Sequence, residues 1–469
     1  MAPHVAALVM AAGSGSRFGG GKLLAPLAGK PLLQHVLDRV AEAGVGEAIV
    51  VLGADAEAVE GAIAWSGATP VRNPDADRGL SSSLVIGMAS IDPGVDAVLI
   101  LLGDQPLVRA STIRALIDAP DDPARPVVVP SYPNDRGRNP VLLRRAAFGL
   151  IDEARGDRGL GPVLDAHPEL VTEVAVMADN PDVDTPGDLV HVVATSWAER
   201  VRANREQVER IREVPDGADF YAPVQSLFRA DPTRTDDPIL NELLDHLRPG
   251  ETWLDVGAGA GRFALPIARA LDDSGGSVIA LDPSASMLES LREIADDYDI
   301  ENVSTVHARW PVASPADLEA DAVLIAHVGY DIEEIGPFVD ALEVAARRLC
   351  IAVFMERQPS SIADACWPPV HGEARVSLPA LPDFVELLEA RGSRPTVTML
   401  EREPRLFDSR DMLVGFLRRQ LWIADDGAKE KRFAKALTTL VVKGVGGFGL
   451  VDQRPLPVGI VTWAPPGAR

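Results

Sequence analysis

A glycine-rich, basic loop near the start of the chain constrains its fold more than any other stretch. Residues 10–22 read Met-Ala-Ala-Gly-Ser-Gly-Ser-Arg-Phe-Gly-Gly-Gly-Lys. The apolar run at 4–10 predicts a buried strand before this loop, and the amphipathic pattern at 31–43 predicts a helix after it. Glycines let backbone N–H groups turn toward an anion, and a helix N-terminus adds partial positive charge. Because Arg17 and Lys22 add full charges, the arrangement predicts a ligand with several phosphates.

Two familiar phosphate-binding loops do not match these residues. A Walker A loop needs Gly six residues before its Lys and Ser or Thr after it, where this chain has Ser16 and Leu23. A Rossmann G-x-G-x-x-G that starts at Gly13 needs a third glycine at the position of Phe18. The pattern that remains is A-A-G-x-G-x-R-F-G-x-x-K.

Length and charge limit the classes of protein that the chain can belong to. A chain of 469 residues predicts two or three domains. Its formal net charge of -24 disfavours nucleic acid and anionic membranes as partners, so an anionic ligand must be captured locally. The two cysteines, Cys350 and Cys366, support neither a disulfide framework nor a cysteine metal site. No apolar run approaches the ~20 residues of a membrane helix, and we expect a cytoplasmic protein.

Residues 1–192 alternate apolar runs with helical patterns, which is typical of a parallel sheet flanked by helices. The expected strands are 5–10, 48–53, 97–102 and 126–130. Ligands of such sheets bind at the carboxyl ends of the strands. The run 97–102 is followed by Gly-Asp-Gln-Pro, which places Asp104 where it can hold Mg²⁺.

Two further polar stretches allow more than one interpretation. The loop from Asn73 to Ser83 leads into an expected helix at about 81–90, and its hydroxyls could contact a base or ribose or could cap the helix. In the second stretch, Asp184 could supply a second metal carboxylate. Equally, Asp184 or Thr185 could cap a helix that starts at Pro186. Spacing alone does not choose between these interpretations.

Together, the 10–22 loop, Asn73 with the serines that follow, Gly-Asp-Gln-Pro, Arg138-Asn139-Pro140 and Asp182-Val-Asp-Thr-Pro186 resemble the MobA-like nucleotidyltransferase fold. Within that fold they are similar to the molybdenum cofactor cytidylyltransferase branch. The resemblance implies Mg²⁺-dependent transfer of CMP from CTP to molybdopterin, with release of pyrophosphate. The catalytic residues it implies are Lys22, Arg17 and Asp104. The implied nucleotide-binding residues are Ala11, Ala12, Gly13, Gly15, Arg17, Lys22, Asn73 and Ser82. It also implies Arg138 and Asn139 near the acceptor, and Asp104 and Asp184 as metal ligands.

A second strand and glycine turn follow a helical, charged linker at 193–245. Residues 252–263 contain G-x-G-x-G with Asp255 before it, and the apolar run 277–282 ends in Asp282. A dinucleotide fingerprint needs a third glycine where this chain has Arg262, and an acid before the loop suits a ligand that bears an ammonium group. With the apolar run 322–326, this pattern favours S-adenosylmethionine over a dinucleotide.

Residues from about 220 to 469 resemble class I methyltransferases that use S-adenosylmethionine. The residues that the resemblance implies for binding it are Asp255, Gly257, Gly259, Gly261, Asp282, Arg309, Trp310 and His327. His327 follows the fourth expected strand and could be a base or a hydrogen-bonded structural histidine. The methyl acceptor has no signature in the sequence.

The expected architecture is therefore two doubly wound, Rossmann-like α/β/α domains at 1–192 and 246–469, joined by the linker at 193–245. The expected protein is a bifunctional nucleotidyltransferase and methyltransferase. Its partners are small molecules, together with proteins that mature molybdoenzymes. An alternative keeps the nucleotidyltransferase but gives it a sugar phosphate or another phosphorylated acceptor. In that alternative the C-terminal domain is a non-catalytic module that binds S-adenosylmethionine or docks a partner.

Overall fold

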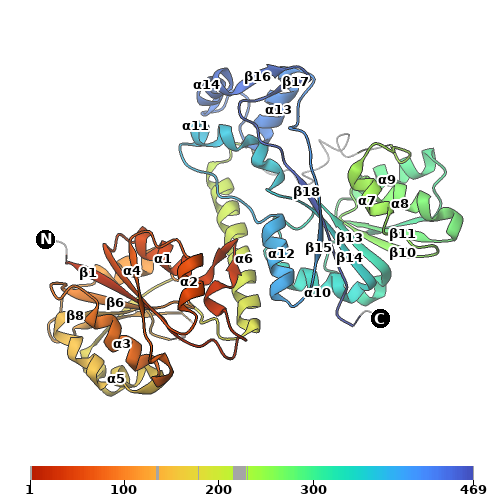
Figure 1. Cartoon of the computed structure of the whole chain (residues 1–469). Helices are drawn as coiled ribbons and strands as arrows, with labels where there is room; N and C mark the ends of the chain where they lie inside the picture. Colours follow the sequence, from red (N-terminus) through yellow and green to blue (C-terminus); the bar gives the residue numbers. More distant parts are fainter. Residues whose placement is uncertain (1–2, 134–136, 178, 215–228, 230, 468–469) are drawn as a thin grey trace. The chain divides into compact units, whose positions relative to one another are not determined.

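The computed structural model describes residues 3–133, 137–177, 179–214, 229 and 231–467. The chain divides into two compact units, Met1–Val193 and Ala194–Arg469 (Figure 1). Helix α6 (Pro186–Ile211) begins in the first unit and ends in the second. Most of the predicted linker beyond this helix, at 215–228 and 230, lies outside the described residues.

The first unit is a 7-stranded sheet in the order β5-β4-β1-β6-β8-β7-β9. Its strands are β1 (Val5–Ala11), β4 (Glu47–Leu52), β5 (Ala68–Arg72), β6 (Ala97–Leu102), β7 (Val127–Ser131), β8 (Val141–Arg144) and β9 (Val171–Ala175). Strand β8 runs antiparallel to both neighbours, and the other pairs are parallel. The helices are α1 (Leu32–Glu42), α2 (Ala56–Ala62), α3 (Leu80–Ala89), α4 (Ala110–Ile117) and α5 (Gly161–Ala166). A short hairpin, β2 (Pro26–Leu27) with β3 (Lys30–Pro31), follows the glycine loop.

Strand β1 shows how this sheet is buried on both faces. Val5, Ala7 and Val9 pack into one apolar cluster, whereas Ala6 and Leu8 pack into the cluster on the opposite face. Alternate side chains of a strand point to opposite faces, so a strand covered on both faces reads as a continuous apolar run. The four predicted strands are confirmed as β1, β4, β6 and β7 within one or two residues.

The second unit is also a 7-stranded sheet, in the order β12-β11-β10-β13-β14-β18-β15. Its strands are β10 (Thr252–Val256), β11 (Ser277–Asp282), β12 (Val303–His307), β13 (Ala320–Ala326), β14 (Ala346–Met355), β15 (Thr396–Leu400) and β18 (Val458–Trp463). Strand β18 is antiparallel to β14 and β15, and the other pairs are parallel. The helices next to this sheet are α7 (Pro238–Leu244), α8 (Ala264–Leu271), α9 (Ala285–Asp297), α10 (Ile335–Ala345) and α12 (Leu381–Ala390). The predicted class of two α/β domains with largely parallel sheets is confirmed.

A separate helical region, which the sequence did not predict, belongs to the second unit. We call residues 356–371 and 401–457 the inserted subdomain. Its elements are α11 (Trp367–His371), α13 (Arg410–Gln420), α14 (Glu430–Leu440), β16 (Val441–Gly444) and β17 (Gly447–Leu450) (Figure 1). It has its own apolar core, which includes Trp367, Phe407 and Phe433.

The position of this subdomain follows from the strands that it joins. Its segments start after β14 and β15 and return at the start of the antiparallel strand β18. All three points lie at the carboxyl edge of the parallel strands, because Met355 at the end of β14 pairs with Val458. The inserted subdomain is therefore attached to the edge at which ligands of α/β sheets bind.

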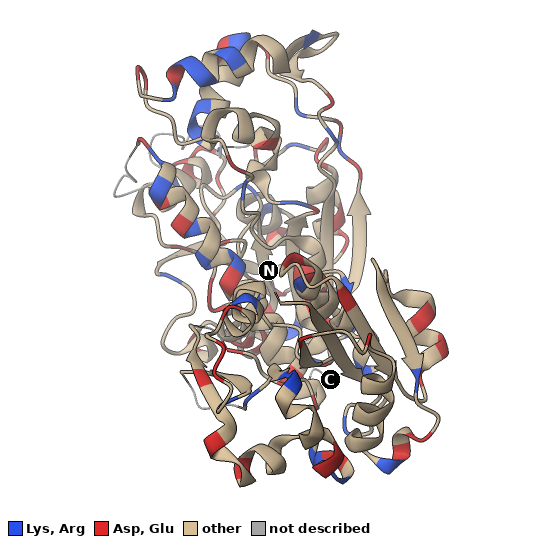
Figure 2. Ribbon diagram, turned by 90° about the vertical axis from the view of Figure 1, so that its left-hand side faces the viewer, with Lys and Arg blue, Asp and Glu red and all other residues tan. Residues whose placement is uncertain are grey.

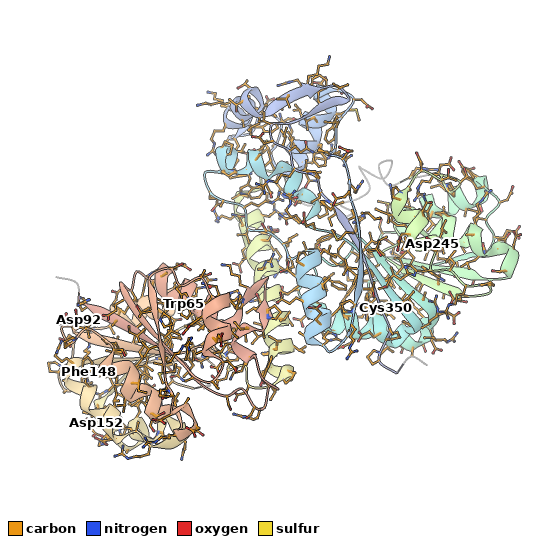
Figure 3. The ribbon with its side chains drawn as sticks, viewed as in Figure 1. Trp65, Asp92, Phe148, Asp152, Asp245 and Cys350 are labelled. Atoms are coloured by element: carbon orange, nitrogen blue, oxygen red, sulfur yellow. The ribbon has the colours of Figure 1, made fainter. Side chains whose placement is uncertain are left out.

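The two cysteines form no disulfide, and acidic residues are spread over the chain, as the composition predicts. Cys350 lies on β14 in the second sheet (Figure 3), and both cysteines are buried and unbridged. Asp and Glu appear along the whole described ribbon, with Lys and Arg between them (Figure 2). Within the described residues, no helix is both long and apolar enough to span a bilayer.

Candidate functional sites

The glycine loop of the first unit folds over one of its own carbonyl groups. The Gly15 carbonyl oxygen accepts the N–H groups of Phe18, Gly19 and Gly20 at 2.9, 3.1 and 3.2 Å. Gly15 has φ +57, and a Cβ there would lie 3.3 Å from the Lys22 Cβ, so this position needs a glycine. The turn carries the chain back from the end of β1 and buries Lys22, which is 9% exposed, beneath the loop.

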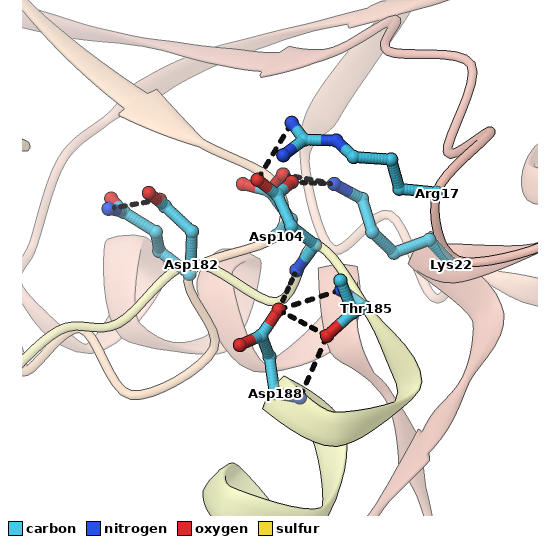
Figure 4. Close-up of polar contacts among 8 residues, drawn as sticks. Arg17, Lys22, Asp104, Asp182, Thr185 and Asp188 are labelled. Carbon is cyan, nitrogen blue, oxygen red and sulfur yellow. Dashed lines mark hydrogen bonds and ion pairs between the residues drawn. The ribbon is translucent and has the colours of Figure 1, made fainter.

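Lys22 connects two of the predicted metal ligands. Its Nζ lies 2.5 Å from the Asp104 Oδ2 and 3.2 Å from the Asp184 Oδ1 (Figure 4). Arg17 reaches the Asp184 Oδ2 at 3.0 Å. The structure thus brings together four predicted site residues from three separate stretches of the chain: Arg17, Lys22, Asp104 and Asp184.

The electrostatics of this cluster keep Lys22 charged. Burial by itself lowers the pKa of Lys22, but the charge and hydrogen bond of Asp104, followed by those of Asp184, raise it above its ordinary value. The pKa of the nearby Asp182 is raised, first by burial and then by the charge of Asp104. The Asp104 Oδ1 is buried and has no hydrogen-bond partner among the described residues.

The structure shows which of the two residues, Asp184 or Thr185, caps the helix that starts at Pro186. Helix α6 starts at Pro186, and Asp188 in its first turn accepts the N–H of Thr185 at 2.7 Å and that of Asp184 at 3.1 Å. The Thr185 hydroxyl accepts the Asp188 N–H at 3.2 Å, as an N-cap does. Thr185 and Asp188 close the helix end between them, which leaves the Asp184 carboxylate for Arg17 and Lys22.

Asn73 and Ser82 bind each other. The Asn73 Nδ2 donates to the Ser82 Oγ at 2.9 Å and to the Ser83 Oγ at 2.8 Å, and its Oδ1 accepts the Asp75 N–H. The Ser82 Oγ in turn donates to the Gly79 carbonyl oxygen at 2.8 Å. These bonds hold the loop before α3 in shape, and in the described part of the chain no hydrogen bond or ion pair links the two residues to the Lys22 cluster. Their nucleotide contact stays a prediction.

Arg138 and Asn139 line a cavity of about 500 Å³. Its apolar wall includes Met10, the next-to-last residue of β1, and Leu102, the last residue of β6, together with Leu84 of α3. The Arg138 guanidinium is paired with Asp165 at 2.9 Å, and the Asn139 carbonyl oxygen accepts the Tyr132 hydroxyl at 2.6 Å. The cavity is therefore next to the glycine loop that follows β1, on the same edge of the sheet.

The structure shows the packing of two glycines, Gly53 and Gly79, and adds one cavity-lining segment, 157–161, that the sequence analysis missed. A Cβ on Gly53, just after β4, would lie 2.4 Å from the Ala12 carbonyl oxygen, so β4 must end in glycine for the loop to pass. A Cβ on Gly79 would lie 2.6 Å from the Gly156 carbonyl carbon, and the segment 157–161 lines the same cavity as Arg138. The three glycines at 156, 159 and 161 were the available signal for this segment.

In the second unit, the glycine turn after β10 surrounds a buried acid. Asp255 is 3% exposed, its Oδ1 has no hydrogen-bond partner among the described residues, and its pKa is raised to about 7. Burial is the main cause, and the charge of Asp282 adds to it, while a backbone hydrogen bond from Ala264 opposes it. Asp282 accepts the Gly259 N–H on Oδ2 and the Ser284 N–H on Oδ1, both at 2.8 Å.

The three glycines of this turn differ in how much space surrounds them. A Cβ on Gly257 would lie 2.5 Å from the Val328 Cγ2, and one on Gly261 would lie 2.8 Å from the Leu265 Cγ. No atom lies within 4 Å of the position of a Cβ on Gly259. The loop is therefore packed at its two ends and open at its centre.

The other three residues predicted for this site, His327, Arg309 and Trp310, differ in burial and in hydrogen bonding. His327 has φ +59 and a buried Nδ1 with no partner among the described residues. Its pKa is lowered to about 4, mainly by burial and then by the charges of Arg402 and Arg262, so its ring is neutral at pH 7. Arg309 is exposed. The Trp310 indole is buried and donates to the Phe338 carbonyl oxygen at 3.3 Å, which directs this side chain into the fold.

Comparison with known proteins identifies both halves at the level of the domain. Residues 7–171 match the family model described as MobA-like NTP transferase domain. Residues 254–349 match the model described as Methyltransferase domain. The chain therefore carries a MobA-like NTP transferase domain followed by a methyltransferase domain.

Individual relatives cover part of the chain. Bifunctional protein GlmU of Desulfitobacterium hafniense is 33% identical over 178 residues, which are 37% of each protein, so the chain spans about a third of the length of the curated relatives it matches. The crystal structure of Rv0371c from Mycobacterium tuberculosis is 31% identical and covers 41% of this chain and 98% of its own, with a TM-score of 0.37. The YcgJ protein of Bacillus subtilis is 15% identical over 48% of this chain and 97% of its own, with a TM-score of 0.34.

Proposed function

We propose that the first domain transfers CMP from CTP to a molybdopterin-type acceptor, and that the second transfers a methyl group from S-adenosylmethionine. The observation that carries the first proposal is the cluster of Lys22, Arg17, Asp104 and Asp184 at the carboxyl edge of the first sheet. It combines two cations, which suit a triphosphate, with two carboxylates, which suit a divalent ion. We keep 1–192, 193–245 and 246–469 as the proposed domain limits.

The carboxylates of this cluster fit magnesium. Mg²⁺ in such sites takes one or two carboxylates and completes its oxygen shell with substrate phosphates and water. The unpartnered Oδ1 of Asp104 offers an oxygen of this kind, and Asp184 supplies a second carboxylate close by. No cluster of three or more His, Cys, Asp or Glu that could hold a metal alone occurs in the described parts of the chain. An ion here thus depends on the substrate's phosphates, and when bound it would neutralise their charge.

The chain's own residues bind and align the substrate in this proposal. A phosphate oxygen of the acceptor attacks the α-phosphorus, the bond to the β-phosphate breaks, and pyrophosphate leaves with the electron pair. Lys22 and Arg17 exchange carboxylate partners for phosphate oxygens when the nucleotide binds. The raised pKa of Lys22 keeps its positive charge in place for that exchange. Alignment and charge stabilisation supply the catalysis, because the protein forms no covalent bond.

The acceptor cavity supports a flat heterocycle. Leu80, Leu84, Ile100 and Leu160 line it, and Arg138 supplies the cation for an anionic group. The same cavity is also lined by Asn139, Asp157 and Asp165, which offer hydrogen-bond partners to the hydroxyl groups of a sugar. A sugar phosphate is therefore the second candidate acceptor, which the experiment below separates from the first.

The second domain's carboxylate fits S-adenosylmethionine. Asp255 has a buried oxygen without a partner, and the cationic amino group of this ligand would supply one. The open space at Gly259 allows a ligand to approach the backbone closely. When bound, the sulfonium supplies the methyl group. The His327 ring, directly after β13, is neutral, and its lowered pKa of about 4 makes it a weak base, so methyl transfer in this proposal relies on alignment of the acceptor with the sulfonium.

The test uses the purified full chain with Mg²⁺. We expect CTP and S-adenosylmethionine each to raise a thermal transition, since a ligand at 100 times its Kd stabilises by roughly 2.7 kcal/mol. Pyrophosphate release is then measured with CTP, GTP or UTP against molybdopterin and against N-acetylglucosamine 1-phosphate. Turnover with CTP and molybdopterin supports the proposal, whereas turnover with the sugar phosphate alone replaces the acceptor. A shift with NADH and none with S-adenosylmethionine contradicts the second half.

A further inference from the structure

The inserted subdomain has the element order of a winged helix. Helix α11, a short strand at Phe407, helices α13 and α14 and the hairpin of β16 and β17 follow one another along the chain (Figure 1). Phe407 and Phe448 of β17 exchange backbone hydrogen bonds at 2.9 and 2.8 Å, so β17 lies between the short strand and β16. Trp367, Leu417 and Phe433 bring the three helices into one apolar core. The second helix of a helix-turn-helix pair is the one that enters the major groove of DNA, and α14 has that place in this order.

Helix α14 has one buried face and one exposed face. Phe433, Ala436 and Leu437 pack into the apolar core of the inserted subdomain. The residues exposed on the opposite face are Lys431, Arg432, Ala434, Lys435, Thr438 and Thr439. With 3.6 residues per turn they form one continuous face, and three of these six side chains are cationic. This face is therefore polar and basic, although the formal net charge of the chain is -24.

The cations of this face have no carboxylate partner. None of Lys431, Arg432 and Lys435 forms a side-chain hydrogen bond or ion pair with any residue that the structure describes. Lys431 and Lys435 are one helical turn apart, a spacing at which like charges destabilise a helix. Lys443 of the next element, β16, is also exposed, and its ammonium lies 5.7 Å from the centre of the Phe448 ring. An anionic partner would relieve the repulsion between these cations.

The acidic residues near α14 do not lie on its exposed face. Glu430, the one acid of this helix, accepts two N–H groups of the Arg418 guanidinium at 2.6 and 3.1 Å. Asp425 and Asp426 are exposed in the connection that precedes the helix, and Asp425 lies 3.2 Å from the Arg418 Nε. These two acids repel an anion before the start of the helix, but residues 429–443 hold five cations and one acid. The region that favours an anion is therefore the body of α14 with the hairpin.

Duplex DNA fits this region better than an anionic membrane does. A helix that binds a membrane surface inserts large apolar side chains, and the exposed face of α14 has none. The major groove is about 12 Å wide and admits an α-helix. Helix α14 has 11 residues, which give a length of about 16 Å. The hydroxyls of Thr438 and Thr439 donate to carbonyl oxygens of the helix and can still accept, as hydroxyls on phosphates and bases do.

We propose that the inserted subdomain binds duplex DNA, with α14 in the major groove and the hairpin on the adjoining backbone. The cations that contact phosphates in this proposal are Lys431, Arg432, Lys435 and Lys443. Because the rest of the chain is acidic, these four contacts supply the attraction, and the affinity is low and strongly dependent on salt. The proposal does not depend on either transfer reaction.

The experiment measures the fluorescence anisotropy of a labelled duplex of mixed sequence as the full chain is added at several salt concentrations. We expect a Kd of roughly 10 μM or tighter at about 50 mM salt. Four phosphate contacts predict that log K falls with log salt at a slope of about -3.6, which is on the order of 100-fold between about 50 and 200 mM.

Variants of equal net charge separate this face from the charge of the whole chain. Arg432→Ala with Lys435→Ala should weaken binding at least about tenfold and flatten the slope to about -1.8. Lys443→Ala should flatten it by about 1. The matched control is Arg269→Ala with Arg394→Ala, which removes two exposed arginines of the same unit outside the inserted subdomain. The control should keep the wild-type affinity and slope.

Three outcomes overturn the proposal. The first is the absence of duplex binding by wild-type protein whose thermal transitions show that it is folded. The second is an equal effect of the two double variants, or no effect of either, which would mean that α14 is not the binding face. The third is binding of polyglutamate or of phosphatidylserine vesicles without binding of the duplex, which would make an acidic protein or a membrane the partner.

Discussion

The two units place a buried aspartate near the carboxyl end of a parallel strand and surround it in opposite ways. Asp104 follows β6 by two residues, and the lysine of its own phosphate loop lies 2.5 Å from it. Asp255 is the residue before the end of β10, and the nearest charge that acts on it is that of another acid, Asp282. The sheets are alike, but the partners of the two carboxylates differ.

This difference agrees with the sign of the charge on the ligand that we propose for each site. A site for an anion must hold cations of its own, and in the empty state those cations need carboxylates such as Asp104 and Asp184. A site for a cation leaves its carboxylate without a positive partner, and the raised pKa of Asp255 is the consequence. Since the fold is shared, the charges around the strand ends distinguish the functions.

The largest expected effect tests the first half of the comparison. Asp104→Asn keeps the shape of the side chain but removes the charge that faces Lys22 and a divalent ion. We expect turnover, measured as pyrophosphate release at saturating nucleotide, to fall on the order of 100-fold or more. Lys22→Met should raise the nucleotide KM as well, because a buried cation for the triphosphate is lost.

The matched control for these variants is Asp152→Asn. Asp152 is an exposed residue of the same unit (Figure 3), and it should keep wild-type turnover. Full activity of Asp104→Asn would remove the metal assignment, and an unchanged nucleotide affinity of Lys22→Met would show that the loop does not bind the triphosphate.

The second expected effect is a change in the pH dependence of stability at Asp255. The pKa of its carboxyl is about 7 in the folded protein against an ordinary value of 3.8. The folded state therefore holds the proton more tightly than the unfolded state, and this contribution to stability is present below pH 4 and is lost as the pH rises through 7. The loss amounts to about 4 kcal/mol at most. In Asp255→Asn, unfolding of the second unit should show a flatter pH profile and greater stability at pH 8.

The same variant should bind S-adenosylmethionine at least tenfold more weakly in calorimetry, because the amino group loses its ionic partner. Asp296→Asn changes an exposed acid of α9 and should alter neither property. If Asp255→Asn kept both the wild-type pH profile and the wild-type affinity, the pKa of Asp255 would not be raised in the folded protein and its carboxylate would not bind S-adenosylmethionine.

The fold could be predicted where the strands are buried on both faces. β1, β4, β6, β10, β11 and β13 read as apolar runs because helices or loops cover both sides of the sheet. Edge strands carry a weaker signal, because β5 contains Pro70 and β9 contains two consecutive polar residues, Thr172 and Glu173. The inserted subdomain could not be placed either, because its amphipathic helices do not specify which apolar surface they cover.

For the site, strand-end positions were enough to predict that Arg17, Lys22 and Asp104 converge, since loops at the carboxyl ends of parallel strands meet at one edge, and the family resemblance added Asp184. Arg17, Lys22, Asp104 and Asp184 do so. The hydrogen-bond partners and directions of individual side chains could not be predicted, because they depend on atoms that are far apart in the sequence. Examples are the bonds between Asn73 and Ser82 and the inward direction of Trp310.

The smallest expected effect separates packing from ligand contact within the second loop. Gly257 and Gly259 both have positive φ, so alanine at either position is strained by about 1–2 kcal/mol. Gly257→Ala should cost about 1–3 kcal/mol more, since its Cβ would lie 2.5 Å from the Val328 Cγ2, whereas Gly259→Ala meets no atom within 4 Å. Adding Val328→Ala should recover part of the loss at Gly257 and none at Gly259, which a double-mutant cycle of unfolding free energies measures. Gly259→Ala should instead act on S-adenosylmethionine affinity, because its methyl group enters the space left for the ligand. No recovery at either position would mean that backbone strain alone, and not the approach of the β13 loop, makes these glycines necessary.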